Sequence, residues 1–165
     1  MQRLARGNRR MNELGDLIAP EAILPRLAAT SRKQALQAMS EAAARVTGIE
    51  ARAIFEAVLL RERNKGTGMG DGVAIPHAPV LGIIQPVGVF ARLDAPQDFE
   101  ALDGRSCDLI FMLLSSPDKG GDHLKALARV ARFFRRADMR EKLRAARGAD
   151  DLYALIVEPA RVDAA

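Results

Sequence analysis

Residues 108–114 read DLIFMLL, and Leu109–Leu114 are the longest strongly apolar run of this 165-residue chain. A short apolar run without alternation is typical of a central strand whose two faces are both covered. The run is far shorter than the stretch of about 20 residues that a membrane-spanning helix requires. We therefore expect a sheet with this strand buried inside it, and no insertion into a membrane.

Further strands are expected on the N-terminal side of this run. Residues 87–93 (VGVFARL) alternate enough for a strand, Val73–Ile75 suits a shorter one, and the polar residues before the apolar run are turn-like. Near the start, Pro20 and Pro25 limit any helix but permit a short strand around residues 22–24. Some strands follow one another too closely for helical crossovers, which indicates a mixed sheet.

Two helices are expected between the first strand and the others. Ser31 followed by Gln34 is a capping-box pattern, and it predicts a helix over residues 32–47 that Gly48 ends. A second helix follows, and its helical spacing puts the guanidinium of Arg61 on the apolar stripe. That stripe consists of Ile54, Ala57, Val58 and Arg61.

Three more helices are expected after the apolar run. The loop SSPDKGG leads to an amphipathic helix with Asp122 as its N-cap. The apolar face of this helix is expected to be Leu124, Leu127, Ala128, Ala131 and Phe134. Short helices over residues 139–146 and 151–157 follow, the last capped by Asp150 or Asp151. Their inward residues are expected to be Met139, Leu143, Leu152, Leu155 and Ile156. The expected fold class is α/β, a mixed β-sheet flanked by α-helices.

One domain with a single core suits a chain of this length, in which 48% of residues are hydrophobic and 28% charged. The formal net charge is +4, and the first ten residues contain four arginines. We expect residues 1–10 to be a disordered basic extension, residues 11–158 the domain and residues 159–165 a frayed C-terminus. No aromatic residue interleaves the arginines to stack on bases, so nucleic-acid binding is not expected.

Several kinds of chemistry find no support in the residues. The single Cys107 cannot form an internal disulfide, and its place beside the apolar run predicts a small buried hydrophobe. His77, His123 and Cys107 lack the paired spacing of a zinc site, so no metal is expected. Neither GxSxG nor a Walker A loop is present, and no cofactor is expected. No apolar signal segment follows the basic N-terminus, which indicates a cytoplasmic protein.

Chemistry is expected at the two histidines of the chain. His77 follows Pro76 at the end of a predicted strand or in the loop beyond it, and His123 lies in the first turn of a predicted helix. Imidazole is largely neutral yet nucleophilic near pH 7, so it can accept a phosphoryl group without a separate base. Three features could hold the added charge: the backbone N–H groups of residues 66–72 (GTGMGDG), the helix start at His123, and Arg61.

The residues alone leave other interpretations open. A histidine in a loop can be an ordinary hydrogen-bonding residue. Arg61 can be a helix-end arginine that lays its methylenes on the core and extends its charge to water. The arginines of residues 1–10 could also serve a nucleic-acid-binding or purely structural module, whose nucleic-acid affinity would fall steeply with salt.

Three motifs in a fixed order point to a known family. They are Arg61-Glu62-Arg63 followed by Thr67-Gly68, then GDGVAIPH at residues 70–77, then His123-Leu124 opening a helix rich in Leu, Ala and Arg. From about residue 11 to residue 157 the sequence resembles the IIA domains of the bacterial phosphoenolpyruvate-dependent phosphotransferase system. The resemblance is to the fructose/mannitol type, and most closely to its nitrogen-regulatory (PtsN) branch. It implies a mixed sheet flanked by helices, in agreement with the expectation from the residues.

The resemblance also implies a function. In the family, the histidine that ends the AIPH motif accepts phosphate from a histidine of a small HPr-like carrier, which places this role on His77. It implies that His123 and Arg61 surround the phosphorylated ring. The chain would then be a phosphohistidine carrier rather than a stand-alone enzyme, with phosphorylation-dependent binding of regulatory target proteins. The alternative is a sugar-transport IIA component that passes phosphate to a separate IIB protein.

Overall fold

The computed structural model describes residues 14–158, and within them six strands form one mixed sheet. The strands are β1 Ile23–Leu27, β2 Gly68–Gly70, β3 Val73–Ala74, β4 His77–Pro79, β5 Val87–Gln97 and β6 Cys107–Ser115. The strand order is β1-β5-β6-β3-β2, and β4 continues along the edge of β6 that β3 occupies. β5 runs antiparallel to β6, whereas β1 is parallel to β5 and both β3 and β4 are parallel to β6.

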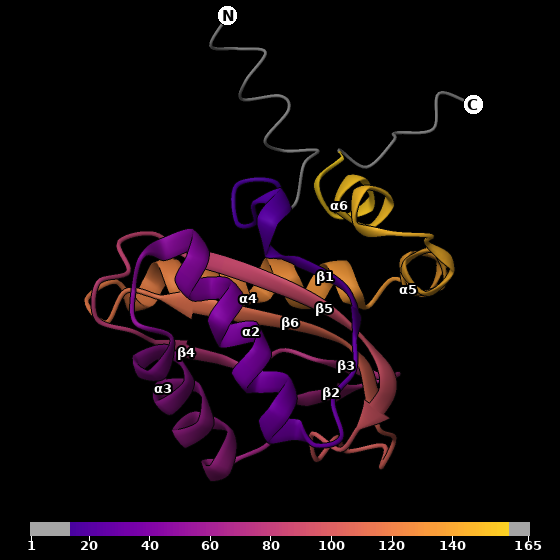
Figure 1. Cartoon of the computed structure of the whole chain (residues 1–165), viewed down its shortest axis with the longest axis horizontal. Helices are drawn as coiled ribbons and strands as arrows, with labels where there is room; N and C mark the ends of the chain where they lie inside the picture. Colours follow the sequence, from indigo (N-terminus) through magenta and orange to yellow (C-terminus); the bar gives the residue numbers. More distant parts are fainter. Residues whose placement is uncertain (1–13, 159–165) are drawn as a thin grey trace, which may run out of the picture.

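Helices cover both faces of this sheet. They are α2 Arg32–Thr47, α3 Ala51–Asn64, α4 Gly120–Phe134, α5 Ala137–Ala145 and α6 Ala149–Val157, with a short 3-10 turn, η1, at Pro20–Ala22. Figure 1 shows α2 and α3 on one face of the sheet and α4 on the opposite face, while α6 contacts β1. The run Leu109–Leu114 is fully buried in β6 between these layers. The predicted α/β class and the buried central strand are both confirmed.

The helix α2 begins and ends where the sequence predicts. The hydroxyl of Ser31 accepts the N–H of Gln34 at 3.1 Å. The side-chain oxygen of Gln34 accepts the N–H of Thr30 at 2.8 Å, one residue earlier than in a standard capping box. Gly48 ends the helix with a φ of 76°, a left-handed conformation that glycine adopts without strain.

Two strands are longer than predicted. β1 continues through Pro25 to Leu27, because it is an edge strand in which a missing N–H costs no ladder hydrogen bond. β5 continues past Leu93 to Gln97, through residues for which the sequence predicts a turn. Gln97 pairs with Cys107 of β6 and donates its side-chain N–H to the carbonyl of Ala29. Backbone pairing therefore extends the strand although its end is polar.

The helix α4 starts earlier than predicted, and its predicted apolar face is correct only in part: Phe134 is buried and Leu127 and Ala131 pack against the core, whereas Leu124 and Ala128 are exposed. It begins at Gly120 after Lys119, so Asp122 lies in the first turn and is not the N-cap. The buried residues are Ala126, Val130, Phe133 and Phe134. Leu124, expected on the apolar face, is 66% exposed. The two phenylalanines fix the rotation of the helix because Phe134 packs against Phe90 and Phe111 at centroid distances of 6.1 and 6.0 Å.

The C-terminal helices are confirmed, but each begins two residues before its predicted start. Gly148 precedes α6, so Asp150 and Asp151 lie in its first turn rather than at its N-cap. Four of the five residues predicted to face inward are buried: Met139, Leu143, Leu152 and Ile156. Leu155 is partly buried.

Cys107 is a buried residue at the start of β6, as predicted. Burial raises the pKa of its thiol to about 12, and its Sγ contacts the carbonyl of Val73. A thiol with this pKa is inert at neutral pH.

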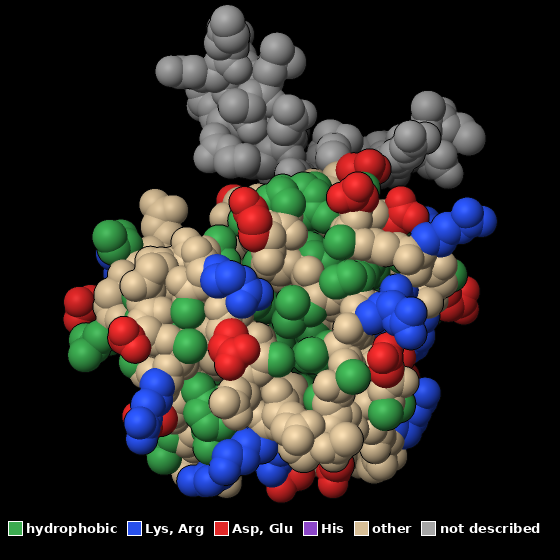
Figure 2. All heavy atoms as spheres, viewed as in Figure 1, with side chains coloured by type: hydrophobic (Ala, Val, Ile, Leu, Met, Phe, Trp, Pro, Cys, Tyr) green, Lys and Arg blue, Asp and Glu red, His purple; other side chains and the backbone are tan. Residues whose placement is uncertain are grey.

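Figure 2 shows acidic and basic side chains interspersed on the face that carries α2 and α3, so this face has no large patch of one charge. Among residues 14–158 no helix combines the length and the apolar character of a membrane span. The predicted basic extension and frayed C-terminus, residues 1–10 and 159–165, lie outside the described residues.

Candidate functional site

His77 is the first residue of β4, directly after the break between β3 and β4. The break falls at Ile75 and Pro76, and the carbonyl of Pro76 still accepts the N–H of Leu113 at 2.8 Å. A proline suits this place because it has no N–H to give to a ladder. The sequence predicted His77 at a strand end or just beyond, and the structure places it where one short strand has ended and the next begins.

The ring of His77 is held in one orientation by its own backbone. Its Nδ1 lies 2.6 Å from the carbonyl oxygen of Ile75. Because a carbonyl oxygen can only accept, Nδ1 carries the proton, and the lone pair of the neutral ring is on Nε2. No other hydrogen bond to this ring occurs in the described part of the chain, so Nε2 is the nitrogen left to react.

His123 faces His77 from the first turn of α4. The two ring centroids are 5.4 Å apart and the rings are tilted by 40°. The backbone N–H of His123 donates to the backbone carbonyl of Lys119, which is the first hydrogen bond of the helix. Its Nδ1 is buried and has no hydrogen-bond partner within residues 14–158. The structure thus brings together the two histidines that the sequence singled out.

Arg61 lies in the last turn of α3 and completes the group. Its Nη1 donates to the carbonyl of Lys65 at 2.7 Å, just past the helix end, and its side chain is partly buried. A guanidinium has five N–H donors, so others stay available for an anion. The Arg61 charge lowers the pKa of both His77 and His123, which places it within electrostatic reach of both rings.

Both imidazoles favour the neutral form. Burial is the largest cause that lowers the pKa of His77, and the charges of Arg61 and His123 act in the same direction against the hydrogen bond to Ile75. Burial and then Arg61 lower the pKa of His123. A neutral, correctly oriented imidazole is the reactive form of a phosphoryl acceptor.

We expect both histidines to titrate below the ordinary value of 6.5, as measured by the NMR shifts of the ring carbon-bound protons against pH. The unfolded chain then binds protons at a higher pH than the folded chain. The free energy of unfolding should therefore fall as the pH drops below about 6.5, and level off below the folded pKa values. The same chain in urea, with ordinary titration midpoints, is the control. A folded-state midpoint above 6.5 for His77 would contradict this assignment.

The Gly-rich stretch, residues 66–72, does not supply the predicted donors for a phosphate. It forms β2 and the turn into β3. Four of its N–H groups already donate to acceptors elsewhere: Gly66 to Glu100 Oε1, Thr67 to Glu62 Oε2, Gly68 to the carbonyl of Phe99, and Asp71 to Asp103 Oδ2. The prediction that this stretch cradles an anion is therefore wrong.

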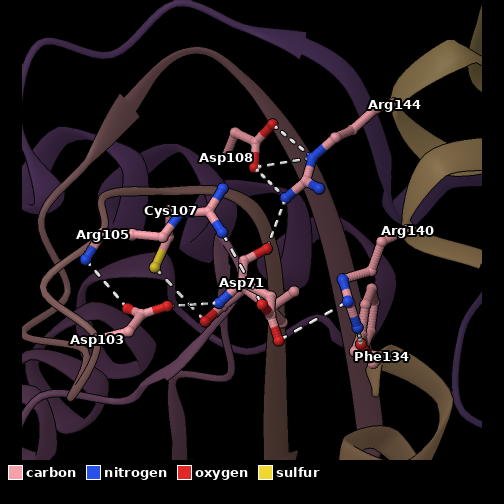
Figure 3. A network of polar contacts seen from close by, with 9 residues as sticks. Asp71, Asp103, Arg105, Cys107, Asp108, Phe134, Arg140 and Arg144 are labelled. Atoms are coloured by element: carbon pink, nitrogen blue, oxygen red, sulfur yellow. Dashed lines mark hydrogen bonds and ion pairs between the residues drawn. The ribbon is translucent and has the colours of Figure 1, made fainter. Parts of the chain in front are cut away.

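The turn between β2 and β3 also lies far along β6 from the histidines. Asp108, near the start of β6, donates its N–H to the carbonyl of Gly72, whereas His77 pairs near the end of that strand. Arg144 of α5 donates to the carbonyl of Asp71 at 2.8 Å and to the carboxylate of Asp108. Figure 3 shows both contacts. These contacts anchor the turn to α5, so the turn serves the fold.

Glu62 is a residue at this site that the sequence analysis missed. It is 1% exposed, and it continues the buried stripe of α3 from Ile54 and Val58. The spacing of four residues from Val58 was the available signal, although a glutamate between two arginines is usually solvated. No group of three or more His, Cys, Asp or Glu side chains within residues 14–158 is arranged to hold a metal ion.

Comparison with known proteins agrees with this geometry. Residues 16–158 match the family described as phosphoenolpyruvate-dependent sugar phosphotransferase system, EIIA 2, and the chain belongs to this family. A nitrogen regulatory protein of Bradyrhizobium diazoefficiens is 51% identical over 144 residues, which cover 87% of this chain and 94% of that protein. Another, from Pseudomonas aeruginosa, is 37% identical over 149 residues, 90% of this chain and 97% of that protein.

The fold is shared with solved structures. The crystal structure of nitrogen regulatory protein IIA-Ntr from Neisseria meningitidis superposes with a TM-score of 0.81 at 30% identity, covering 87% of this chain and 99% of that one. The predicted resemblance to the nitrogen-regulatory branch of the phosphotransferase IIA domains is confirmed.

Proposed function

We propose that this chain is a phosphohistidine carrier of the nitrogen-regulatory type, in which Nε2 of His77 accepts a phosphoryl group from a histidine of an HPr-like protein. The observation that carries the proposal is the hydrogen bond from Nδ1 of His77 to Ile75. It fixes the tautomer and leaves Nε2 as the only nucleophilic nitrogen of a ring beside Arg61 and His123. Membership of the EIIA 2 family supports the same reaction class.

The transfer follows from the groups present. The lone pair on Nε2 forms the new N–P bond while the N–P bond of the donor breaks, and that electron pair returns to the donor nitrogen. No proton has to leave His77, because its N–H stays on Nδ1 in the bond to Ile75. The Arg61 guanidinium neutralises the negative charge on the equatorial oxygens of the phosphoryl group, and the neutral ring of His123 donates a hydrogen bond to one of them. The dipole at the N-terminus of α4 stabilises the negative charge of the phosphoryl group by about 0.3–1 kcal/mol.

Exposed apolar side chains flank the site in sequence and suit a protein donor. Leu60 precedes Arg61 and Leu124 follows His123, and Leu81 and Ile84 lie in the loop after β4. All four are large apolar side chains exposed to solvent, which mark surfaces that bind proteins when they lie together. We assign them to the docking surface of the HPr-like donor and of later partners.

The regulatory role is proposed from the relatives. Nitrogen regulatory proteins match this chain over 87% of its length or more, and over nearly all of their own length. Binding of target proteins at this surface would depend on the phosphorylation state, because a dianion on His77 changes both charge and shape. A second candidate is a sugar-transport IIA component that passes phosphate to a separate IIB protein, which the family description favours.

The test is a reconstituted relay. The protein is incubated with phosphoenolpyruvate, enzyme I and an HPr-like carrier, and the modified residue is mapped by mass spectrometry under conditions that preserve acid-labile phosphate. We expect one phosphoryl group, on His77, that appears only when the carrier is present. Rapid transfer from the phosphorylated protein to a fructose or mannitol IIB protein would favour the second candidate. A chain that takes no phosphate from any such carrier would refute both.

A further inference from the structure

Glu62 is a buried carboxylate whose two oxygens both bind one residue. Oε2 accepts the backbone N–H of Thr67 at 2.9 Å, and Oε1 accepts the hydroxyl of Thr67 at 2.6 Å. Burial raises the pKa of Glu62, while the Thr67 bonds and the charges of Arg32 and Arg61 favour its ionised form. A buried charge held this closely constrains where Thr67 can lie.

Thr67 is connected to the ring of His77 by hydrogen bonds through Ile75. The carbonyl of Thr67 accepts the N–H of Ile75 at 3.1 Å, and the carbonyl of Ile75 accepts the Nδ1 proton of His77 at 2.6 Å. Ile75 is therefore held at its N–H by Thr67 and engaged at its carbonyl by His77. An unbroken chain of hydrogen bonds runs from Glu62 to the imidazole.

The same loop also meets Arg61. The carbonyl of Lys65, two residues before Thr67, accepts a hydrogen bond from Nη1 of Arg61. Residues 65–67 thus contact both the guanidinium of Arg61 and the carboxylate of Glu62. A shift of this short loop would move both the ring of His77 and the charge that serves it.

Glu62 also pairs with a residue from a different part of the fold. Arg32, the first residue of α2, lies 3.5 Å from Oε2 of Glu62 and 3.8 Å from Oε2 of Glu100. The other oxygen of Glu100 accepts the N–H of Gly66. The loop at residues 65–67 is therefore held by side chains from α2, α3 and the segment after β5. Its position depends on how these three segments pack together.

We infer that Glu62 is a positioning residue for phosphoryl transfer: through Thr67 and Ile75 it fixes the tautomer and orientation of His77, and through the same loop the place of Arg61. The inference rests on the proposed carrier function. Glu62 lies on the buried side of the loop and is not assigned any contact with the phosphoryl group. Its effect should therefore fall on the transfer step and on the imidazole itself, with the affinity for the donor unchanged.

The test compares Glu62→Met, which removes both acceptors at similar length, with Glu62→Gln. The glutamine side chain can keep both contacts because its oxygen accepts the Thr67 N–H while its amide donates to the Thr67 hydroxyl. Nitrogen NMR of His77 should show the Nδ1–H tautomer in the unmodified protein and in Glu62→Gln, but a mixture with the Nε2–H tautomer in Glu62→Met. Single-turnover transfer from the phosphorylated donor should be at least about tenfold slower in Glu62→Met, with the same donor Kd.

Glu56→Met is the matched control, because Glu56 lies on the same helix with its side chain 64% exposed. It should change neither the tautomer nor the rate. If Glu62→Met fails to fold, Thr67→Val provides the same measurement, since it removes only the hydroxyl bond and should shift the tautomer in the same direction while Thr67→Ser restores it.

The outcomes separate this inference from the carrier function. A wild-type tautomer and rate in Glu62→Met, or in Thr67→Val where that variant replaces it, would overturn the positioning role and leave the carrier function standing. A wild-type protein that takes no phosphate would refute the carrier function, while the NMR spectra would still decide whether Glu62 orients the ring.

Discussion

Replacing His77 by alanine is expected to abolish the uptake of acid-labile phosphate from an HPr-like donor. The chain contains two histidines, so His77→Ala leaves only His123 as a possible phosphohistidine. His123 lacks the bond that fixes a tautomer in His77, because its Nδ1 has no hydrogen-bond partner within the described residues. The measurement is the amount of labelled phosphate per protein after incubation with phosphoenolpyruvate, enzyme I and the donor.

His123→Ala provides the comparison that makes this result specific. It should still carry phosphate on His77, but at a lower rate, because one donor to the phosphoryl oxygens is lost. Thermal unfolding of both variants checks that the fold survives, which is expected for half-buried side chains at the edge of the core. Labelling of His77→Ala at the wild-type rate would remove His77 from the role of acceptor.

The fold was predictable where a local signal and a tertiary constraint coincide. Leu109–Leu114 is apolar at every position, and such a strand is stable only between two layers, which is where β6 lies. The helix α2 carries its own start at Ser31 and its own stop at Gly48. In these elements the chain's local preference already agrees with the folded structure.

The predictions were wrong where contacts between residues distant in sequence decide the structure. The predicted apolar face of α4 included both Leu124 and Phe134, but the helix is turned so that Phe133 is buried with Phe134, which meets Phe90 and Phe111 on the sheet. Spacing along one helix gives its period, whereas its rotation depends on what it packs against. Leu124 is exposed as a result.

At the candidate site, too, local sequence signals predicted some residues and tertiary contacts decided others. His77, His123 and Arg61 were chosen for their chemistry and their local positions, and they do converge. They converge because β4 pairs with β6, α3 ends near His77 and α4 begins near it. These are tertiary contacts, and a local sequence pattern does not predict them. Glu62 was missed because its burial requires Thr67 and Arg32 to arrive from other segments.

Replacing Arg61 by glutamine is expected to slow phosphoryl transfer to His77 by about 10²–10³-fold, the usual cost of removing one donor that stabilises developing negative charge. The cause is the loss of a guanidinium that lies within electrostatic reach of both imidazoles. Its loss should act on the transfer step more than on donor affinity, so kcat falls and KM changes little. Single-turnover rates at varied donor concentration separate the two. The bond to Lys65 is lost as well, which should cost about 1 kcal/mol of stability.

Arg61→Lys distinguishes charge from geometry. Lysine keeps the charge but not the planar fork of donors, so it should restore only part of the rate. Arg63→Gln, an exposed arginine in the same last turn of α3, is the matched control and should transfer at the wild-type rate. Removing Arg61 also removes a cation that disfavours protonation of His77, so the pKa of His77 should rise in Arg61→Gln. An unchanged His77 titration in Arg61→Gln would contradict the electrostatic contact between Arg61 and the ring. An Arg61→Gln protein as fast as Arg63→Gln would refute transition-state stabilisation by Arg61.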